Sequence, residues 1–554
     1  MNASNPVNWR RNVVWLAFGL SIYFGAKWND VALSALFDSQ GISNAGDILS
    51  GLLQPDFSPD FLGRIVWLSL ESLLIGILGT VLSLVIGISI ALIAIQVPAL
   101  PDSPDNEHYL LRAAAGFARW SARFFLGLLR TIPEIVWAYL FVRLIGLGPG
   151  AAVMAIGLTV GGSIGKLYSE LAEAAAPGPI QALRANGANR FSILLFAVIP
   201  QVIRQWLAYG LFRMECNIRT GTILGVVGAG GLGAEIALSI RYFEFDKLAT
   251  ALLAVLLLVI FLEFVSAYLR KAPLRYTIAL IVCGTFVSVL YLKIPWMELF
   301  TGDINFIGEI DISTIAPEFV TRTLWLVLET LGMAWVATMS AAIIAFFLAP
   351  VASATLFGSS YLPDTYTGSL TDKLASWGLL GVMRLVLQFF RAMPELTFAL
   401  VFVVWVGPGA FAGILAIGVH SVGVLGRLYT DIYEEVEPGP PRALQATGAG
   451  VTGVWLFSVL PQVSSRLIAY TLFRFEVNIR ATAMVGFVGA GGIGDALHTA
   501  ISLFHFTDLA VLLLVLLVVV TLVDMAGDRI RRRLLSPPGE KAAARPLIET
   551  TVVA

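Results

Sequence analysis

The sequence has few charged residues for its length. They make up 13% of the 554-residue chain, about half of the roughly 25% that is usual in soluble domains. Hydrophobic residues make up 57%, and many apolar runs reach the roughly 20 residues that a helix needs to cross a bilayer. This composition excludes a set of ordinary soluble domains and predicts an all-α, polytopic membrane protein.

Cysteine and histidine are also scarce. Cys216 and Cys283 lie in apolar sequence without CxxC or Cys/His spacing, so neither a disulfide nor a metal site is indicated. The 4 histidines are scattered along the chain, which favours structural roles over ligand roles. The net charge of −1, without a basic stripe, gives no indication of a nucleic-acid partner.

A complete phosphate-binding loop is missing as well. Gly165-Lys166-Leu167 resembles the end of such a loop, but Val160 stands where its first glycine is needed. Leu167 also replaces the Ser or Thr that would bind magnesium. We therefore predict no catalytic residue and no cofactor in this chain. If ATP drives the protein, ATP and Mg²⁺ bind to a separate ATPase subunit.

What the sequence does contain is an internal repeat. The segment from Leu211 to Gly233 is identical at 14 of 23 positions to the segment that lies 261 residues later. A period of this length indicates two fused copies of one unit and not a solenoid array. We predict a first repeat over residues 1–270, a second over 271–535 and a short, disordered cytoplasmic tail over 536–554.

The hydropathy pattern predicts about 12 transmembrane helices, half of them in each repeat. They are expected at residues 12–26, 66–96, 124–146, 148–165, 191–211 and 247–268, and at 276–293, 323–350, 380–406, 408–425, 452–472 and 507–526. The first run resembles a signal peptide but lacks a persuasive cleavage site, so we interpret it as a retained span. An even number of spans per repeat makes the repeats parallel, with a pseudo-two-fold axis along the membrane normal.

The distribution of charge predicts the orientation in the membrane. Residues 27–64 and 293–322 each carry five acidic residues against two basic ones. Basic residues gather instead at the N-terminus, at the junction of the repeats and near the C-terminus, as Arg10, Arg11, Arg270, Lys271, Arg275, Arg529, Arg531, Arg532 and Arg533. By the positive-inside rule, both termini and the junction are cytoplasmic and the acidic segments are outside.

One polar segment in each repeat is expected to dock a soluble partner. After a Pro-Gly-Pro sequence, a short helical stretch ends at Gly187 or Gly448, as helices do where the chain turns through positive φ. An ordinary loop, which is usually variable, leaves the match between the two repeats unexplained. The predicted docking residues are Ala182, Leu183, Arg184, Asn186, Gly187, Ala188, Ala443, Leu444, Gln445, Thr447, Gly448 and Ala449. The copies differ in charge, because Gln445 and Val451 stand where the first repeat has Arg184 and Arg190.

Together with Ile199-Pro200 and Leu460-Pro461, these segments resemble the EAA coupling loop in permease subunits of ATP-binding-cassette (ABC) importers. Gln181 and Arg442 stand in place of the initial Glu of that motif. The Arg-x-Glu-x-Asn-Ile-Arg sequences at 213–219 and 474–480, each followed by a glycine-rich segment, resemble the phosphonate-type subfamily. Members of that subfamily are commonly single-unit chains that pair, whereas this chain carries both copies.

The resemblance implies the type I importer (MetI-like) architecture and alternating access. It implies transport of phosphonate or a related small phosphorus oxyanion, such as phosphite, hypophosphite or a phosphate ester, across the bacterial cytoplasmic (inner) membrane. The implied partners are two ATPase subunits or an ATPase homodimer on the cytoplasmic face, a solute-binding protein outside, and membrane lipid. A secondary transporter with parallel six-helix repeats is the main alternative; a channel and a non-transporting scaffold also remain open.

The glycine-rich segments satisfy a GxGxxG pattern literally, but that pattern binds dinucleotides only after a strand of a βαβ unit. Each segment here follows an apolar helix. Glycine lets backbones approach closely, so we interpret the segments as close packing or a bend near an outer gate. The glycines concerned are Gly228, Gly230, Gly231, Gly233, Gly489, Gly491, Gly492 and Gly494.

Ionisable side chains inside the predicted spans are candidates for a translocation path, because such residues usually face the bundle interior or a wet path. Arginine suits a phosphorus oxyanion, because its planar fork donates two parallel hydrogen bonds. The alternative is that pairs four residues apart, such as Glu215 and Arg219, neutralise each other and fix helix register. Glu71 and Glu329 are equally ambiguous. The candidates are Arg130, Glu134, Arg213, Glu215, Asn217, Arg219, Arg391, Glu395, Arg474, Glu476, Asn478 and Arg480.

Overall fold

The computed structural model describes residues 9–96, 109–297, 317–354 and 370–535. These residues form helices and turns and no strand, which confirms the prediction of an all-α protein. The acidic residues between 298 and 316 and the predicted tail over 536–554 lie outside the described residues.

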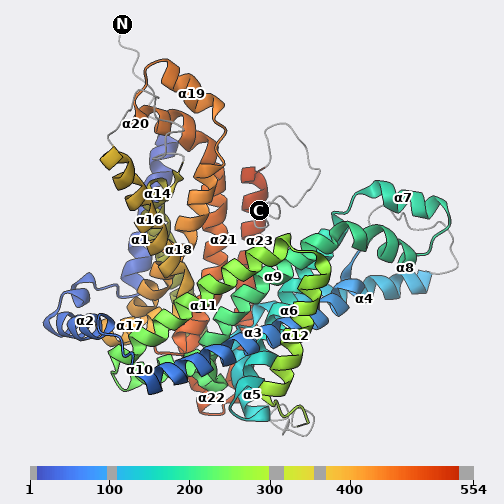
Figure 1. Ribbon diagram of the computed structural model, residues 1–554, viewed down its shortest axis with the longest axis horizontal. Helices are drawn as coiled ribbons and strands as arrows, with labels where there is room; N and C mark the ends of the chain where they lie inside the picture. Colours follow the sequence, from blue (N-terminus) through green and yellow to red (C-terminus); the bar gives the residue numbers. More distant parts are fainter. Residues whose placement is uncertain (1–8, 97–108, 298–316, 355–369, 536–554) are drawn as a thin grey trace. The chain divides into compact units, whose positions relative to one another are not determined.

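The described residues form two compact units (Figure 1). The first-repeat unit holds residues 49–297, and the second-repeat unit holds residues 9–48 and 317–535. The first-repeat unit contains α3 (Pro59–Ala94), α4 (Tyr109–Thr131), α5 (Glu134–Ile145), α6 (Pro149–Glu173), α7 (Pro177–Ala185), α8 (Arg190–Ile193), α9 (Ile199–Leu224), α10 (Gly231–Arg241), α11 (Phe245–Lys271) and α12 (Leu274–Leu292). The second-repeat unit contains α1 (Trp9–Trp28), most of α2 (Ser39–Leu52), α14 (Pro317–Ala352), α16 (Leu370–Ala392), α17 (Glu395–Val406), α18 (Ala410–Glu434), α19 (Gly439–Ala446), α20 (Val451–Val454), α21 (Leu460–Gly486), α22 (Gly492–Ser502) and α23 (Phe506–Leu535).

All of the predicted spans fall on helices, but two of them are sharply bent. The helix pairs α4/α5 and α16/α17 turn through 89° and 90°, where single spans over 124–146 and 380–406 were expected. Pro133 and Pro394 lie at these breaks, because proline lacks an N–H and forces the residue before it out of the helical region. Of the described helices, 8 are long and apolar enough to cross a membrane, or up to 10 if each bent pair is one span.

The core of each unit surrounds one central helix, α6 or α18. Helix α6 packs against α3, α4, α5 and α9, and α18 packs against α14, α16, α17 and α21. Small residues allow close approach in such interfaces: a Cβ on Gly87 of α3 would lie 2.8 Å from the carbonyl oxygen of Gly161 in α6. At this point the backbones of α3 and α6 are in close contact.

The first helix of each predicted repeat packs against the long helix of the other repeat. In α1, Trp28 stacks on Trp325 of α14 with 4.8 Å between ring centroids, and Trp335 Nε1 donates a hydrogen bond to Ser21 Oγ at 3.1 Å. In α12, Tyr291 stacks on Trp67 of α3 with 6.2 Å between ring centroids. The exchange is symmetric, because Trp67 and Trp325 are the matching residues of the two repeats.

A π-helical turn precedes α9 and α21. It covers Leu194–Val198 in one unit and Trp455–Val459 in the other. Pro200 and Pro461 follow two residues after these turns, and each lacks the N–H that an α-helix would need there. The Ile199 N–H consequently bonds to the Leu194 carbonyl, five residues back. The same interruption occurs at matching positions of both repeats.

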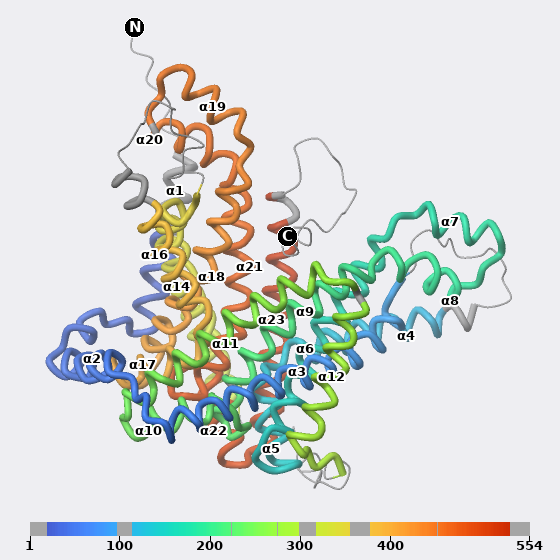
Figure 2. Tube along the Cα trace, viewed as in Figure 1, coloured from blue at the N-terminus to red at the C-terminus, as the bar shows by residue number. Residues whose placement is uncertain are grey.

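In each unit the docking segment and the glycine-rich segment lie far apart. Figure 1 shows α7 and α8 at one end of the first-repeat unit and α10 at the other. Figure 2 shows the same separation between α19 and α22 in the second-repeat unit. The docking and glycine-rich segments thus occupy opposite ends of each unit.

Candidate functional site

The first predicted docking segment forms α7 and ends in a Schellman motif. Gly187 has φ of +74°. Its N–H donates to the Arg184 carbonyl at 2.9 Å, and the Ala188 N–H donates to the Leu183 carbonyl at 3.1 Å. These bonds satisfy carbonyls that a helix end otherwise leaves without partners.

The second segment forms α19 and ends in the same way. Gly448 has φ of +84°, and its N–H donates to the Gln445 carbonyl at 2.8 Å. The Ala449 N–H donates to the Leu444 carbonyl at 3.4 Å. An added Cβ on Gly187 or Gly448 would meet nothing within 4 Å. Glycine is therefore required by the backbone angle and not by lack of space.

The predicted docking residues of both segments are exposed or partly exposed. Only Ile180 in α7 and Pro441 in α19 are buried within these helices. They are matching residues, 261 positions apart. One side chain of each short helix is thus buried, and its other residues remain exposed or partly exposed.

The two docking segments differ in how they are held. Asn189 Oδ1 accepts from the Ser192 N–H at 2.8 Å and caps α8, and Arg190 Nη2 donates to the Ile95 carbonyl at 2.9 Å. The matching residues of the second repeat are Gly450 and Val451, which have no side-chain groups for these bonds. The charge difference seen in the sequence is therefore also a difference in anchoring.

Sequence reasoning missed an Arg–Glu pair beside each docking helix. Arg123 of α4 pairs with Glu173, the last residue of α6. Arg384 of α16 pairs with Glu434, the last residue of α18, at 2.5 Å. Both residues recur after 261 positions, so the repeat offset could have revealed these pairs.

The glycine-rich segments connect α9 to α10 and α21 to α22 without any strand, which agrees with their interpretation as packing segments. The Gly231 N–H donates to Glu71 Oε2 at 3.0 Å, and the Gly492 N–H donates to Glu329 Oε1 at 3.1 Å. A carboxylate at a helix N-terminus satisfies a free N–H and opposes the positive end of the helix dipole. The ambiguous glutamates therefore cap α10 and α22.

We expect the variants Glu71→Ala and Glu329→Ala to loosen the start of α10 and α22. Loss of such a cap typically costs about 0.5–2 kcal/mol, which corresponds to roughly 2- to 30-fold faster local opening. Hydrogen–deuterium exchange over residues 225–235 and 486–496 would measure it. Glu→Gln variants keep an acceptor oxygen and should exchange more slowly than the Ala variants. Exchange at the wild-type rate in Glu71→Ala and Glu329→Ala would contradict the capping role.

The candidate path residues on α9 and α21 include two buried asparagines that cross-link helices within a unit. Asn217 Nδ2 donates to Thr80 Oγ1 of α3 at 2.9 Å, and Asn478 Nδ2 donates to Thr338 Oγ1 of α14 at 2.8 Å. Both asparagines have 0% exposure. Arg474 Nε adds a bond to Ser421 Oγ at 3.1 Å.

The acidic residues in the same clusters have different partners in the two units. Glu215 lies 4.0 Å from Arg219, one turn along α9. Glu476 instead pairs with Arg531 of α23, and both side chains are 6% exposed. Within the described residues, Arg480 lies 3.8 Å from Asp524 of α23. The expected neutralisation within one helix is thus observed on α9, whereas α21 is tied to α23.

The other candidate pairs do not share a helix. Arg130 belongs to α4 and Glu134 to the first turn of α5, and Arg391 and Glu395 are divided in the same way between α16 and α17. The alternative that such pairs fix the register of one helix therefore does not apply to these two pairs. Glu395 Oε2 lies 3.6 Å from His420 Nε2. The residue of the first repeat that matches His420 is Thr159.

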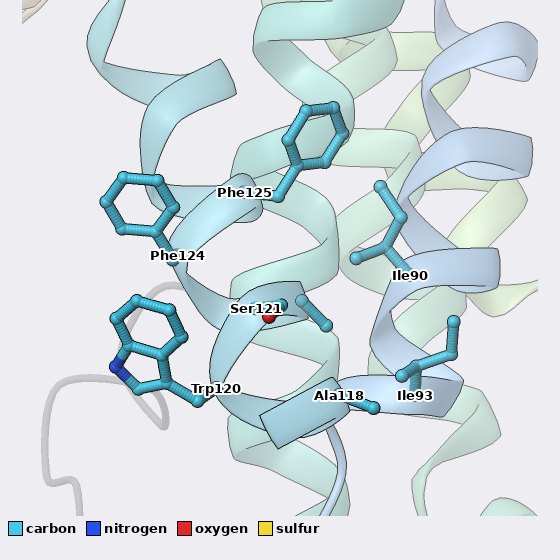
Figure 3. Close-up of a pocket in the computed structure, with 8 residues that line it drawn as sticks. Ile90, Ile93, Ala118, Trp120, Ser121, Phe124 and Phe125 are labelled. Atoms are coloured by element: carbon cyan, nitrogen blue, oxygen red, sulfur yellow. The ribbon is translucent and has the colours of Figure 1, made fainter. Parts of the chain in front are cut away.

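A pocket of about 540 Å³ between α3 and α4 is unsuited to an oxyanion (Figure 3). Apart from Ser121, its lining is apolar or aromatic: Ile90, Ile93, Ala118, Trp120, Ala122, Phe124 and Phe125. Among the described residues, no group of three or more His, Cys, Asp or Glu side chains could hold a metal ion.

Comparison with known proteins matches both repeats to one family. The family "Binding-protein-dependent transport system inner membrane component" matches residues 111–275 and 365–536. The chain is 30% identical to the phosphate-import permease protein PhnE of Mycolicibacterium smegmatis, over 91% of this chain and 92% of that protein. It is 31% identical to the phosphite transport system permease protein PtxC of Stutzerimonas stutzeri, over 48% of this chain and 90% of that protein.

Among solved structures, the MetNI methionine ABC transporter matches 40% of this chain and 100% of its own chain. The identity is 22% and the TM-score is 0.35. The sequence matches confirm the resemblance to permease subunits of phosphonate-type ABC importers and the presence of two permease units in one chain. The chain belongs to the family of binding-protein-dependent transport system inner membrane components.

Proposed function

We propose that this chain is the complete transmembrane part of an ABC importer, with α7 and α19 as the helices that dock two ATPase subunits or an ATPase homodimer. The observation that carries this proposal is the pair of exposed, glycine-terminated helices 261 residues apart. Two matched docking helices suit two ATPase copies, so one chain would replace the usual pair of permease subunits. ATP and Mg²⁺ would bind only to those partners.

The proposed substrate is phosphonate or a related small phosphorus oxyanion, such as phosphite, hypophosphite or a phosphate ester. The relatives named for phosphate and phosphite transport support this class. Arg213 adds physical support, because its Nε is buried and has no hydrogen-bond partner in the described residues. In a state that opens this part of α9 to the path, a guanidinium N–H of this kind would be available to donate to an oxyanion.

The proposed mechanism is alternating access, with the docking helices on the cytoplasmic side. ATP binding would draw α7 and α19 together and open the path outward. A solute-binding protein at the outer face would then release its oxyanion past the gates formed around Gly230 and Gly491. Hydrolysis would restore the inward-open state. Both termini would be cytoplasmic, in a bacterial inner membrane, as the distribution of basic residues predicts.

Transport by the complete complex in proteoliposomes tests this function. With ATPase and binding protein present, we expect ATP-dependent uptake of at least one of phosphite, hypophosphite, methylphosphonate and glycerol phosphate, and none of sulfate. Uptake driven by an ion gradient without any ATPase would instead establish a secondary transporter. ATP-dependent uptake of sulfate alone would keep the importer but overturn the substrate class.

A further inference from the structure

The cytoplasmic end proposed for the first-repeat unit contains a junction between three helices. Ala94 is the last residue of α3, so its carbonyl lacks a helical partner. Arg123 of α4 donates to this carbonyl from Nε and Nη2, both at 3.2 Å. Glu173 of α6 accepts from the Gln96 N–H at 2.8 Å and also pairs with Arg123.

The second-repeat unit contains the same junction. Arg384 Nε donates to the carbonyl of Ala352, the last residue of α14, at 2.9 Å. Glu434 Oε1 accepts from the Ala354 N–H at 2.9 Å and pairs with Arg384. Arg384 and Glu434 lie 261 residues after Arg123 and Glu173. Ala352, at the end of α14, lies 258 residues after Ala94, at the end of α3. The junction is therefore kept although the connection after the long helix differs in length.

Stability alone is a weak reason for this arrangement. The side chains of Arg123 and Glu173 are 47% and 29% exposed, and those of Arg384 and Glu434 are 37% and 31% exposed. Ion pairs with such exposure contribute little to folding, because water and salt screen them. The pairs instead fix geometry. The guanidinium holds the last carbonyl of the long helix, and the carboxylate holds an N–H two residues later.

The pairs lie where a docking helix begins. Glu173 ends α6 four residues before α7, and Glu434 ends α18 five residues before α19. A displacement of α7 would be transmitted to α3 through the first junction, and a displacement of α19 to α14 through the second. In the first-repeat unit the connection is doubled, because Arg190, beyond α7, donates to the Ile95 carbonyl at 2.9 Å.

We propose that Arg123–Glu173 and Arg384–Glu434 are positioning residues that transmit movement of α7 and α19 to α3 and α14. This inference rests on the proposed function, because the ATPase supplies the movement. The two junctions differ in their second connection: Arg190 donates to the Ile95 carbonyl in the first, whereas in the second Trp455, which follows α20, contacts Phe346 of α14 edge to face with 5.4 Å between ring centroids.

The test uses the complete reconstituted complex. It measures how much oxyanion is taken up per ATP hydrolysed, with the oxyanion that the transport assay shows to be carried. For Glu173→Ala/Glu434→Ala, we expect the ATPase to co-purify and hydrolyse ATP, while uptake per ATP falls at least fivefold. Glu173→Gln/Glu434→Gln keeps an acceptor oxygen and should fall between this variant and the wild type. Glu435→Ala is the matched control, because Glu435 pairs with Arg466 of α21 at 3.0 Å and not with α14.

The second connection of the first junction is tested with Arg190→Val/Glu173→Ala, which should lower uptake per ATP more than Glu173→Ala alone. Unchanged uptake per ATP in the double glutamate variant would overturn the inference. Loss of ATPase co-purification would also overturn it, since the pairs would then serve folding or docking alone. Failure of the proposed function is distinct, because the wild-type complex itself would show no ATP-dependent uptake.

Discussion

The double variant Gly187→Ala/Gly448→Ala is expected to lose nearly all ATP-dependent uptake. Both glycines adopt positive φ, +74° and +84°, and an L-residue with a Cβ pays roughly 1–2 kcal/mol in this region. If the sites are independent, the docking geometry is disfavoured by about 2–4 kcal/mol, which is roughly 30-fold or more in population. Co-purification of the ATPase should fall with uptake, because the ends of both docking helices would be remodelled.

The matched control is Gly178→Ala/Gly439→Ala. These glycines lie in the same two helices and are also 261 residues apart. They lack positive φ, and an added Cβ at either would meet nothing within 4 Å. The control should retain uptake and ATPase binding. Equal losses in both double variants would mean that surface change, and not the helix-ending turn, causes the effect.

The docking helices were predictable because their signals are local. The glycine after each docking helix marks the end of that helix from sequence alone, and the repeat supplies a second copy of the signal. The start was not predicted: the helical stretch was expected after Pro-Gly-Pro, whereas α7 begins at Pro177 and α19 at Gly439, because proline is tolerated in the first turn of a helix. The glycine-rich segments were also assigned to packing, because an apolar helix precedes them where a nucleotide site needs a strand.

The remaining features depend on contacts that sequence spacing does not encode. Hydropathy averages over Pro133 and Pro394, so each bent helix pair was expected as one continuous span. The exchange of α1 and α12 depends on which long helix each contacts. Residues 50 positions apart, such as Arg123 and Glu173, become neighbours only when α4 and α6 pack together.

The variant Arg531→Leu is expected to destabilise the protein by roughly 3–5 kcal/mol, because it leaves the carboxylate of Glu476 buried without its cation. Glu476 and Arg531 are each only 6% exposed as side chains, and they join α21 to α23. Chemical unfolding of the purified chain in detergent would measure the loss. The matching residue of the first repeat, Arg270, is exposed and bonds to Ser266 Oγ at 3.1 Å. Arg270→Leu should therefore change stability by less than about 1 kcal/mol.

A variant that lacks both charges shows how much the ion pair itself contributes to the free energy of unfolding, apart from the penalty of burying one unpaired charge. In Glu476→Met/Arg531→Leu no ionised side chain of this pair stays buried, and apolar side chains of similar volume replace it. Such replacements are often neutral or stabilising, so the double variant should regain most of the stability lost in Arg531→Leu. The resulting coupling energy would be large and favourable, as expected for residues in direct contact. If the stability lost in the double variant equalled the sum of the losses in Arg531→Leu and Glu476→Met, the two side chains would not be coupled. Glu476 would then have to be stabilised by groups other than Arg531.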